Sequence, residues 1–181
     1  MKNKSILDIG CGDGYFLQSI SKNFSHKRLV GIDVSLPSLT KHHPDIEFKV
    51  ADIINFNLNY KFDVVFSDQV LEHITPVDLP MHLRSVGLSL KDGGVFIVNM
   101  PNRLFGPSDV TRIVDFTYTG KTAAQGTHLN ESTYTELIPI LENHGFKNCG
   151  TVCFLPKLKR FLINWRVSPW PLQVIEGSLC Y

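Results

Sequence analysis

Apolar stretches of strand length alternate along this chain with stretches in which apolar residues recur at helical spacing. Uninterrupted apolar residues are typical of strands that a parallel sheet buries on both faces. Such stretches, rich in Ile, Val and Phe, occur at Ser5–Ile9, Arg28–Asp33, Ile46–Ala51, Phe62–Ser67 and Gly93–Met100. Helices are predicted between them at Tyr15–Ser21 and at Pro76–Leu90, the second with Thr75 as its N-cap. This alternation predicts an α/β fold built on a doubly wound, mostly parallel sheet.

The pattern changes in the C-terminal part of the chain. Pro101–Asn130 shows neither a helical nor a strand period, and so long a connection inside a domain is usually functional. Order resumes with a helix that begins after Thr133, where Glu136 has the spacing of a capping box, and that Gly145 ends. Lys147–Phe154 is predicted as a sixth strand. We therefore expect a single domain over residues 1–181, with a lid or substrate segment at about 101–130.

Composition narrows the class of protein without naming a function. Hydrophobic residues make up 43% of the chain and charged residues 19%, which is ordinary for a globular domain. A net charge of +1 without any basic run argues against nucleic acid as a partner. The chain has no apolar run long enough to span a membrane and no signal peptide, so we expect a cytoplasmic protein with no integral membrane segment. Its cysteines match no zinc-binding spacing.

The first predicted strand runs into the glycine-rich stretch "ILDIGCGDGYFL". Glycine is costly in regular structure, so Gly10, Gly12 and Gly14 indicate a sharp turn or a ligand pressed against the backbone. A strand, a glycine loop and a helix in this order form a site for an adenosine-containing ligand. A dinucleotide loop has its third glycine one position later, where this chain has Tyr15. The spacing therefore argues against a nicotinamide cofactor.

Acidic residues end the first three predicted strands, which places them at one edge of the sheet. Asp33 comes about 20 residues after the loop, where a carboxylate can accept both ribose hydroxyls; the alternative is an acid that caps a helix after Ser35. Asp52 can meet an adenine amine while Ile53 covers the ring, and its alternative is a plain turn residue. With Asp8, three such acids at neighbouring strand ends favour a ligand site.

Taken in order, several short motifs resemble those of class I S-adenosylmethionine-dependent methyltransferases. They are "ILDIGCGDG", "GIDVS", "VADI", "FDVVFSDQVLEHI" and "LKDGGVFIVNMPN". The chain is most similar to the branch that includes ubiquinone-biosynthesis O-methyltransferases and related small-molecule enzymes, over about Ser5–Phe154. The resemblance implies a Rossmann-like sheet of seven strands, the seventh incomplete here, with the cofactor across its carboxyl edge.

By this resemblance, the chain transfers a methyl group from S-adenosylmethionine to a small-molecule acceptor by in-line displacement. The sequence after the fourth strand, Ser67–Asp68–Gln69, differs from the motif of many amino-group methyltransferases, which favours oxygen, or else carbon, over nitrogen as the methylated atom. The alternative is a non-catalytic or truncated cofactor-binding domain that acts with a partner chain. The implied cofactor-binding residues are Asp8, Gly10, Cys11, Gly12, Gly14, Asp33, Val34, Asp52, Ile53, Ser67 and Asp68.

Two histidines are candidates for the base that removes a proton from an oxygen nucleophile. His73 follows the fourth strand, and His128 lies where the predicted lid returns to the sheet. The alternative for each is a structural histidine that steadies its loop. Glu72–His73 also resembles part of a metal site of some quinone methyltransferases, but Gln69 stands where those enzymes have an acid. We therefore predict no metal.

The lid and the start of the chain carry the remaining expectations. Arg103 and Arg112 are candidates to meet an anionic group of the substrate, and the alternative is pairing with Asp109 and Asp115 on the surface. Relatives carry helices before the first strand that help to cover the cofactor, whereas this sequence enters the strand near Ser5. We expect the lid, a partner subunit or a second copy in a homodimer to supply that cover, unless the sequence is a fragment.

Overall fold

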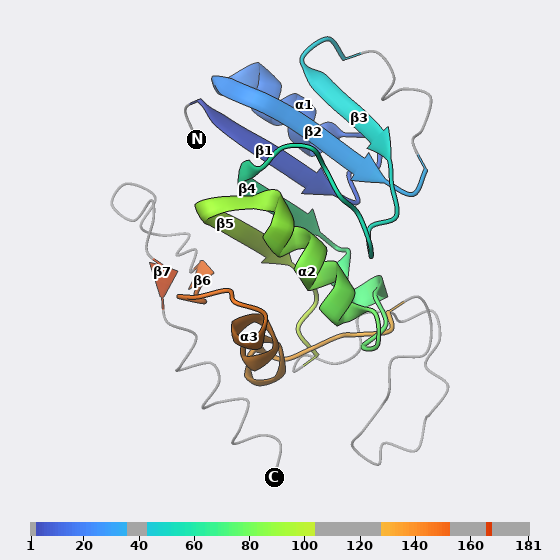
Figure 1. Ribbon diagram of the computed structural model, residues 1–181, viewed down its shortest axis with the longest axis vertical. Helices are drawn as coiled ribbons and strands as arrows, with labels where there is room; N and C mark the ends of the chain where they lie inside the picture. The colour runs from blue at the N-terminus through green and yellow to red at the C-terminus, as the bar shows by residue number, and fades with distance from the viewer. Residues whose placement is uncertain (1–2, 36–42, 104–127, 153–165, 168–181) are drawn as a thin grey trace, which may run out of the picture. The chain divides into compact units, whose positions relative to one another are not determined.

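Five parallel strands form the main sheet of the structure, which is a computed structural model describing residues 3–35, 43–103, 128–152 and 166–167 (Figure 1). The strands are β1 (Lys4–Ile9), β2 (His26–Asp33), β3 (Ile46–Val50), β4 (Phe62–Asp68) and β5 (Leu90–Asn99). Their order is β3-β2-β1-β4-β5, and every pairing is parallel. The direction of winding therefore reverses between β1 and β4, the point at which ligands bind in open α/β sheets.

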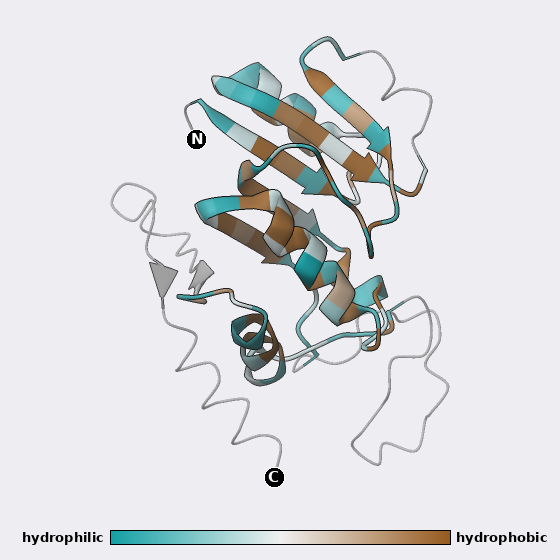
Figure 2. Cartoon of the chain, in the orientation of Figure 1, coloured by the Kyte–Doolittle hydropathy of each residue, from teal (hydrophilic) through white to brown (hydrophobic). Residues whose placement is uncertain are grey.

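Helices cover this sheet on both faces, which confirms the predicted doubly wound fold. Figure 1 shows α1 (Tyr15–Asn23) behind the strands and α2 (Leu79–Ser89) in front of them. In Figure 2 the strands at the centre of the sheet are mostly hydrophobic. One core cluster forms between α1 and the sheet from Ile6, Leu17, Ile20, Leu29 and Ile46. Burying a side chain such as Leu17 contributes roughly 1.5–3 kcal/mol, so this core fixes α1 and the loop before it.

Among the elements around the main sheet, the starts of α2 and β5 differ most from the predicted boundaries. Helix α2 begins at Leu79 rather than Pro76, but the residues before it already turn, because the Thr75 carbonyl accepts the N–H groups of Asp78 and Leu79 at 3.0 Å each. The Thr75 hydroxyl oxygen also accepts the Asp78 N–H at 3.2 Å. The N-cap of α2 is nevertheless Asp78, so the prediction of Thr75 at that position is wrong. Strand β5 starts at Leu90, directly after α2, rather than at Gly93. The prediction began too late because the polar residues before Gly93 interrupt the apolar run.

Contacts divide the chain into two compact units, Met1–Pro101 with Pro107–Glu131 and Asn102–Gly106 with Ser132–Tyr181. The main sheet belongs to the first. The second contains α3 (Tyr134–Asn143), whose predicted capping box between Thr133 and Glu136 is present. The chain leaves α3 through Gly145 at a φ of +89°, as predicted.

The predicted sixth strand is shorter than expected and pairs differently. β6 (Thr151–Val152) pairs antiparallel with β7 (Arg166–Val167) in a separate two-stranded sheet. Within the described residues it does not join the main sheet. The apolar run had indicated a strand but carried no information about its partner.

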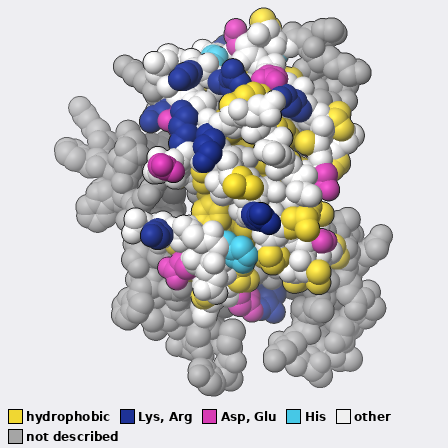
Figure 3. Space-filling view, viewed as in Figure 1, with side chains coloured by type: hydrophobic (Ala, Val, Ile, Leu, Met, Phe, Trp, Pro, Cys, Tyr) yellow, Lys and Arg dark blue, Asp and Glu magenta, His cyan; other side chains and the backbone are white. Residues whose placement is uncertain are grey.

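Charged side chains gather where the strands of the main sheet begin. Figure 3 shows Lys and Arg side chains concentrated on that side of the visible face. Asp63, at the start of β4, lies 2.8 Å from the Lys91 ammonium and 3.6 Å from that of Lys4. The Asp63 carboxylate also accepts both the backbone N–H and the hydroxyl of Ser5. These hydrogen bonds and the Lys91 charge hold the pKa of Asp63 well below its usual range.

Among the described residues, no helix combines the length and the apolar character that crossing a bilayer requires.

Candidate functional site

The glycine loop lies at the carboxyl end of β1, the central strand of the sheet. Gly10, Gly12 and Gly14 all have positive φ, at +69°, +48° and +72°, a region that side-chain-bearing residues rarely adopt. The N–H groups of Gly10 and Cys11 donate to the Ile32 carbonyl of β2 at 2.8 and 3.1 Å. The loop is therefore held in one conformation by the neighbouring strand.

The three glycines meet different surroundings. A Cβ at Gly10 would lie 2.5 Å from Val70 Cγ2, and one at Gly14 would lie 2.6 Å from the Phe48 ring. A Cβ at Gly12 would have no atom within 4 Å. Gly10 and Gly14 are thus required by packing inside the protein, whereas Gly12 presents bare backbone to open space, where a ligand can approach.

Asp33, the last residue of β2, connects that strand to the loop. Its Oδ2 accepts the Gly12 N–H at 2.9 Å, and its Oδ1 accepts the Ser35 N–H at 3.1 Å. The second bond matches part of the alternative expectation, an acid that turns the chain after β2; residues 36–42 lie outside the described residues. Val34, beside it, is exposed. The carboxylate therefore stands next to the open backbone of Gly12.

Acidic groups dominate this edge of the sheet. Asp8 on β1 is buried, and its burial, together with the nearby charges of Asp68 and Asp33, raises its pKa from 3.8 to about 7. Burial and the charges of Asp8 and Asp33 raise the pKa of the Cys11 thiol to about 12, so that thiol stays neutral. No basic side chain of the described residues contributes to either shift. A cation at this edge would therefore relieve the repulsion between the carboxylates.

The end of β3 leads into a short segment that a buried histidine holds. Asp52 is exposed and accepts the Ile54 N–H at 2.8 Å, which fits a turn residue and leaves its other oxygen available. The neighbouring Ile53 carbonyl accepts the Nδ1–H of His82 at 2.7 Å. His82 lies in α2 with no exposed surface, and burial lowers its pKa, so the ring is neutral. His82 was not among the predicted site residues; its position among the apolar residues of α2 was the signal in the sequence.

The end of β4 contributes one buried hydroxyl and one exposed acid. Ser67 is fully buried, and its Oγ has no hydrogen-bond partner within the described part of the chain. Asp68 is exposed and accepts a hydrogen bond from the Asn99 side chain at the end of β5. Both residues lie at the carboxyl end of β4, which pairs with β1, the strand that carries Asp8.

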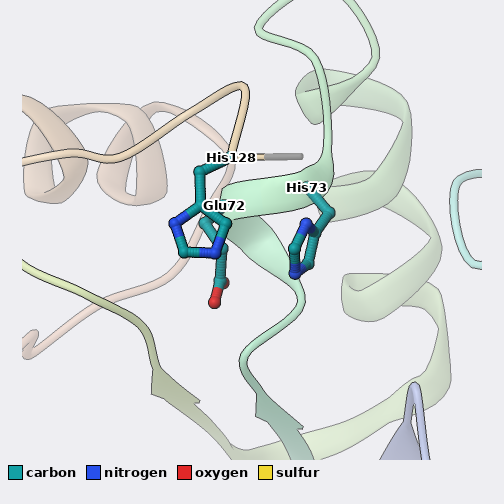
Figure 4. A group of neighbouring side chains, drawn as sticks. All are labelled: Glu72, His73 and His128. Atoms are coloured by element: carbon teal, nitrogen blue, oxygen red, sulfur yellow. The ribbon is translucent and has the colours of Figure 1, made fainter. Parts of the chain in front are cut away.

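A second cluster lies just beyond β4 and brings together Glu72, His73 and His128 (Figure 4). Glu72 and His73 belong to the short 3₁₀ helix η2 (Leu71–His73), and His128 comes from a later part of the chain. The rings of His73 and His128 meet edge to face with centroids 5.0 Å apart. The Glu72 side chain is fully buried, neither of its carboxylate oxygens has a hydrogen-bond partner among the described residues, and burial raises its pKa. Its backbone carbonyl accepts the N–H groups of Leu129 and Asn130, which fixes the segment that carries His128. Both predicted base candidates thus lie together.

Comparison with known proteins identifies the family. The methyltransferase domain family matches residues 1–149, which is most of the chain. The chain belongs to this family. The resemblance stated from the motifs is therefore confirmed.

Individual relatives of this methyltransferase domain agree with the family match. A probable S-adenosylmethionine-dependent methyltransferase of Mycolicibacterium smegmatis is 28% identical over 149 residues, 80% of this chain and 52% of the relative. A ubiquinone biosynthesis O-methyltransferase of Bradyrhizobium diazoefficiens is 28% identical over 130 residues, 68% of this chain and 49% of the relative. The chain thus spans about half the length of these curated relatives. An S-adenosylmethionine-dependent methyltransferase from Mesorhizobium loti has the same fold, with a TM-score of 0.51 at 23% identity, over 57% of this chain and 50% of that one.

The histidine cluster of this methyltransferase domain is also a combination that divalent metals accept, because it offers one carboxylate and two imidazoles. One candidate ligand atom from each of Glu72, His73 and His128 lies within 4.8 Å of the others. Gln69, at the position where the resemblance expects an acid, is exposed and has a φ of +55°. The prediction that the domain holds no metal stays a prediction.

The predicted lid falls largely outside the described residues. Arg112 and the aromatic residues of that segment belong to residues 104–127. Arg103 is described and forms an ion pair with Glu136, an acid of α3 that also closes the capping box. Both partners are partly exposed. Asp109 and Asp115, the alternative partners, lie outside the described residues. The role of the lid in choosing a substrate therefore stays a prediction.

Proposed function

We propose that this chain binds S-adenosylmethionine at the carboxyl edge of its main sheet and transfers the methyl group to an oxygen of a small-molecule acceptor. The observation that carries the proposal is the open backbone at Gly12, whose N–H donates to Asp33 Oδ2. Bare backbone lets a nucleoside lie close to the loop, and a carboxylate beside it can accept ribose hydroxyls. The names of the relatives support the same cofactor.

The charge of the edge supports a sulfonium nucleoside over a dinucleotide. S-adenosylmethionine carries positive charge on its sulfur and its amino group, whereas a dinucleotide brings a negatively charged pyrophosphate. Burial and the charges of Asp68 and Asp33 raise the pKa of Asp8, and no basic side chain of the described residues counteracts this shift. A cation that entered the site would relieve this repulsion, and a pyrophosphate would add to it.

The strand ends would divide the cofactor between them. Asp33 would hold the ribose hydroxyls, and Asp52 with Ile53 would hold adenine, with the Ile53 segment anchored by the bond from His82. The methionyl end would lie near Asp8 and Asp68, whose carboxylates suit an ammonium group. The neighbouring residues Cys11, Val34 and Ser67 complete the proposed surface.

The bound cofactor supplies a methyl group that is already activated by its positive sulfur. The protein then has to align the acceptor oxygen with that methyl group, exclude water and remove one proton from the oxygen. His128 is the proposed base, and His73, whose ring packs against it, would help to orient the acceptor. The proton moves from the acceptor hydroxyl to the imidazole as the oxygen–carbon bond forms and the carbon–sulfur bond breaks.

The choice of oxygen rests on the chain after β4. The stretch Ser67–Asp68–Gln69 lacks the consecutive prolines of many amino-group methyltransferases. A ubiquinone biosynthesis O-methyltransferase among the relatives supports the same choice. A lid over 101–130 and a partner subunit or second copy that covers the site remain part of this proposal.

Calorimetric titration with S-adenosylhomocysteine, with NAD as the control ligand, tests the cofactor site. We expect about micromolar binding of the first and none of the second. Gly12→Ala should weaken binding at least about tenfold, because its methyl group would occupy the open space that the ligand needs. Gly93→Ala is the matched control, since Gly93 also has positive φ (+71°) and no atom near its Cβ position but lies at the opposite end of the sheet.

Both alanine variants should lose about 1–2 kcal/mol of stability from the left-handed backbone. Only Gly12→Ala should lose affinity. Equal affinities of the two variants, or binding of NAD by the wild-type chain, would contradict the proposed site. Binding of S-adenosylhomocysteine without methyl transfer to any hydroxylated acceptor would contradict the catalytic part alone.

A further inference from the structure

One acidic residue near the proposed base was not among the residues that the sequence analysis selected. Glu131 lies three residues after His128, and its Oε1 is 2.6 Å from His128 Nδ1. Its side chain is only 1% exposed, and that of His128 is 15% exposed. Burying a carboxylate costs free energy unless it is hydrogen-bonded or paired with a charge. The bond to His128 is therefore important for keeping Glu131 in this position.

The contact determines which ring nitrogen carries the proton. An ionised carboxylate can only accept, so His128 Nδ1 must be the donor in this bond. In the neutral imidazole the other nitrogen, Nε2, then has a free lone pair. Figure 4 shows that nitrogen on the side of the ring that faces Glu72 and His73. The basic atom of His128 is thereby directed toward the other two members of the cluster.

The backbone between the two residues is held in place independently of this bond. Leu129 and Asn130, the residues between His128 and Glu131, donate their N–H groups to the Glu72 carbonyl at 2.6 and 3.0 Å. The ring of His128 also packs edge to face against His73. The backbone bonds therefore hold the segment and His73 packs against the ring, but among the contacts of the described residues named here the bond to Glu131 is the one that distinguishes the two nitrogens.

We propose that Glu131 is a positioning residue that keeps the proton of neutral His128 on Nδ1 and so presents Nε2 as the base toward Glu72 and His73. This inference rests on the proposed function, because it gives His128 the role of the base. It assigns the acid to orientation of that base and not to contact with the substrate. An ion pair that only stabilised the segment would make no such distinction between the ring nitrogens.

Long-range ¹H–¹⁵N correlation spectra of the full chain test this directly, because the chemical shifts of the two ring nitrogens report the tautomer. The spectra are recorded about two pH units above the ordinary imidazole pKa of about 6.5, with a chelator present. His128→Gln assigns the signals among the seven histidines of the chain. In the wild-type chain we expect the Nδ1–H form to exceed the Nε2–H form at least about tenfold, since a hydrogen bond to a charged group is worth a factor of that size.

Two variants at the same position separate the orienting bond from simple packing. Glu131→Leu removes every acceptor, so the Nδ1–H excess should disappear. Glu131→Gln keeps the shape but can either accept from or donate to Nδ1, so both tautomers should be populated. Glu142→Gln, which removes an exposed carboxylate of α3, is the control and should leave the spectrum of His128 unchanged.

An Nε2–H tautomer in the wild-type chain would overturn the inference without any variant. An Nδ1–H excess that survived in Glu131→Leu would overturn it as well. Titration of the same samples with S-adenosylhomocysteine keeps the two proposals apart. Intact cofactor binding with the wrong tautomer contradicts only the role of Glu131, whereas the expected tautomer without cofactor binding contradicts only the proposed function.

Discussion

At the edge where the main sheet begins, Asp63 has the Lys91 ammonium at 2.8 Å and two hydrogen bonds from Ser5. At the edge where the strands end, Asp8 is buried, and within the described part of the chain the charges that shift its pKa are the carboxylates of Asp68 and Asp33. The two acids belong to adjacent strands, yet the pKa of Asp63 is held below its usual range and that of Asp8 is raised to about 7. Burial, followed by the neighbouring carboxylates, raises the pKa of Asp8, whereas hydrogen bonds from Lys91 and Ser5 lower that of Asp63.

This contrast indicates what each edge is for. Paired charges at the first edge stabilise the sheet and need no further partner. Unpaired charges at the second edge cost stability, and proteins keep such costs mainly where function requires them.

Asp8→Asn should stabilise the protein without ligand at alkaline pH. The folded form of Asp8 has a raised pKa, so it binds its proton more tightly than the unfolded form, and its contribution to stability falls as pH rises from about 4 to about 7. A shift of about 3 units sets an upper limit of about 4 kcal/mol. Urea unfolding at about pH 5 and pH 8 measures how the difference between variant and wild type changes with pH. Asp92→Asn, at an exposed position of the opposite edge, is the control. A difference that did not grow with pH would show that Asp8 is not a strained acid.

Asp33→Ala should lower the affinity for S-adenosylhomocysteine by about a hundredfold. The substitution removes a charged acceptor for two hydroxyls and also the acceptor of the Gly12 N–H. Calorimetric titration gives the affinity, and Asp92→Ala serves as the control on the other edge. An affinity within a few-fold of that of the wild type would mean that the end of β2 does not contact the ribose of the cofactor.

Asp63→Asn should destabilise the protein by about 1–2 kcal/mol at neutral pH. Because the folded pKa of Asp63 is depressed, its contribution is complete above the unfolded value of about 4 and is lost as pH falls further. The difference between variant and wild type should therefore shrink in urea unfolding experiments at about pH 3. A difference of the same size at both pH values would argue for lost packing instead of lost charge.

Lys4→Met should have the smallest effect, below about 0.5 kcal/mol. Its ammonium is 3.6 Å from Asp63 and its side chain is 52% exposed, so solvent screens the pair. Lys91→Met should cost more, since Lys91 also donates to the Ser5 hydroxyl. Equal costs for the two lysines in the same unfolding assay would mean that exposure does not decide their contributions.

Local signals in the sequence predicted most of what the structure contains. The capping box of Thr133 and Glu136 and the positive φ of the loop glycines depend on neighbouring residues, so their spacing was sufficient. The acids at the strand ends were found for the same reason. The family and the fold class are confirmed by the comparisons and by the sheet.

The features that were missed depend on contacts between distant residues. Phe48 and Val70 fill the space beside Gly14 and Gly10, which the sequence analysis had assigned to the ligand together with Gly12. His82 reaches Ile53 from another element, and β6 pairs with β7 outside the main sheet. A pattern of residue types along the chain indicates that a residue is buried, but it does not identify the neighbour.

The position of β1 has a consequence for how the protein is made. β1 pairs with β4, and the hydrogen bond between Ser5 and Asp63 spans 58 residues. During synthesis β1, α1 and β2 therefore leave the ribosome long before β4 does, with one side of β1 still unpaired. An open strand edge at the centre of a future sheet invites pairing with other chains. We expect newly made chains to be most exposed to aggregation in this interval and least exposed once the pairs around Asp63 have formed.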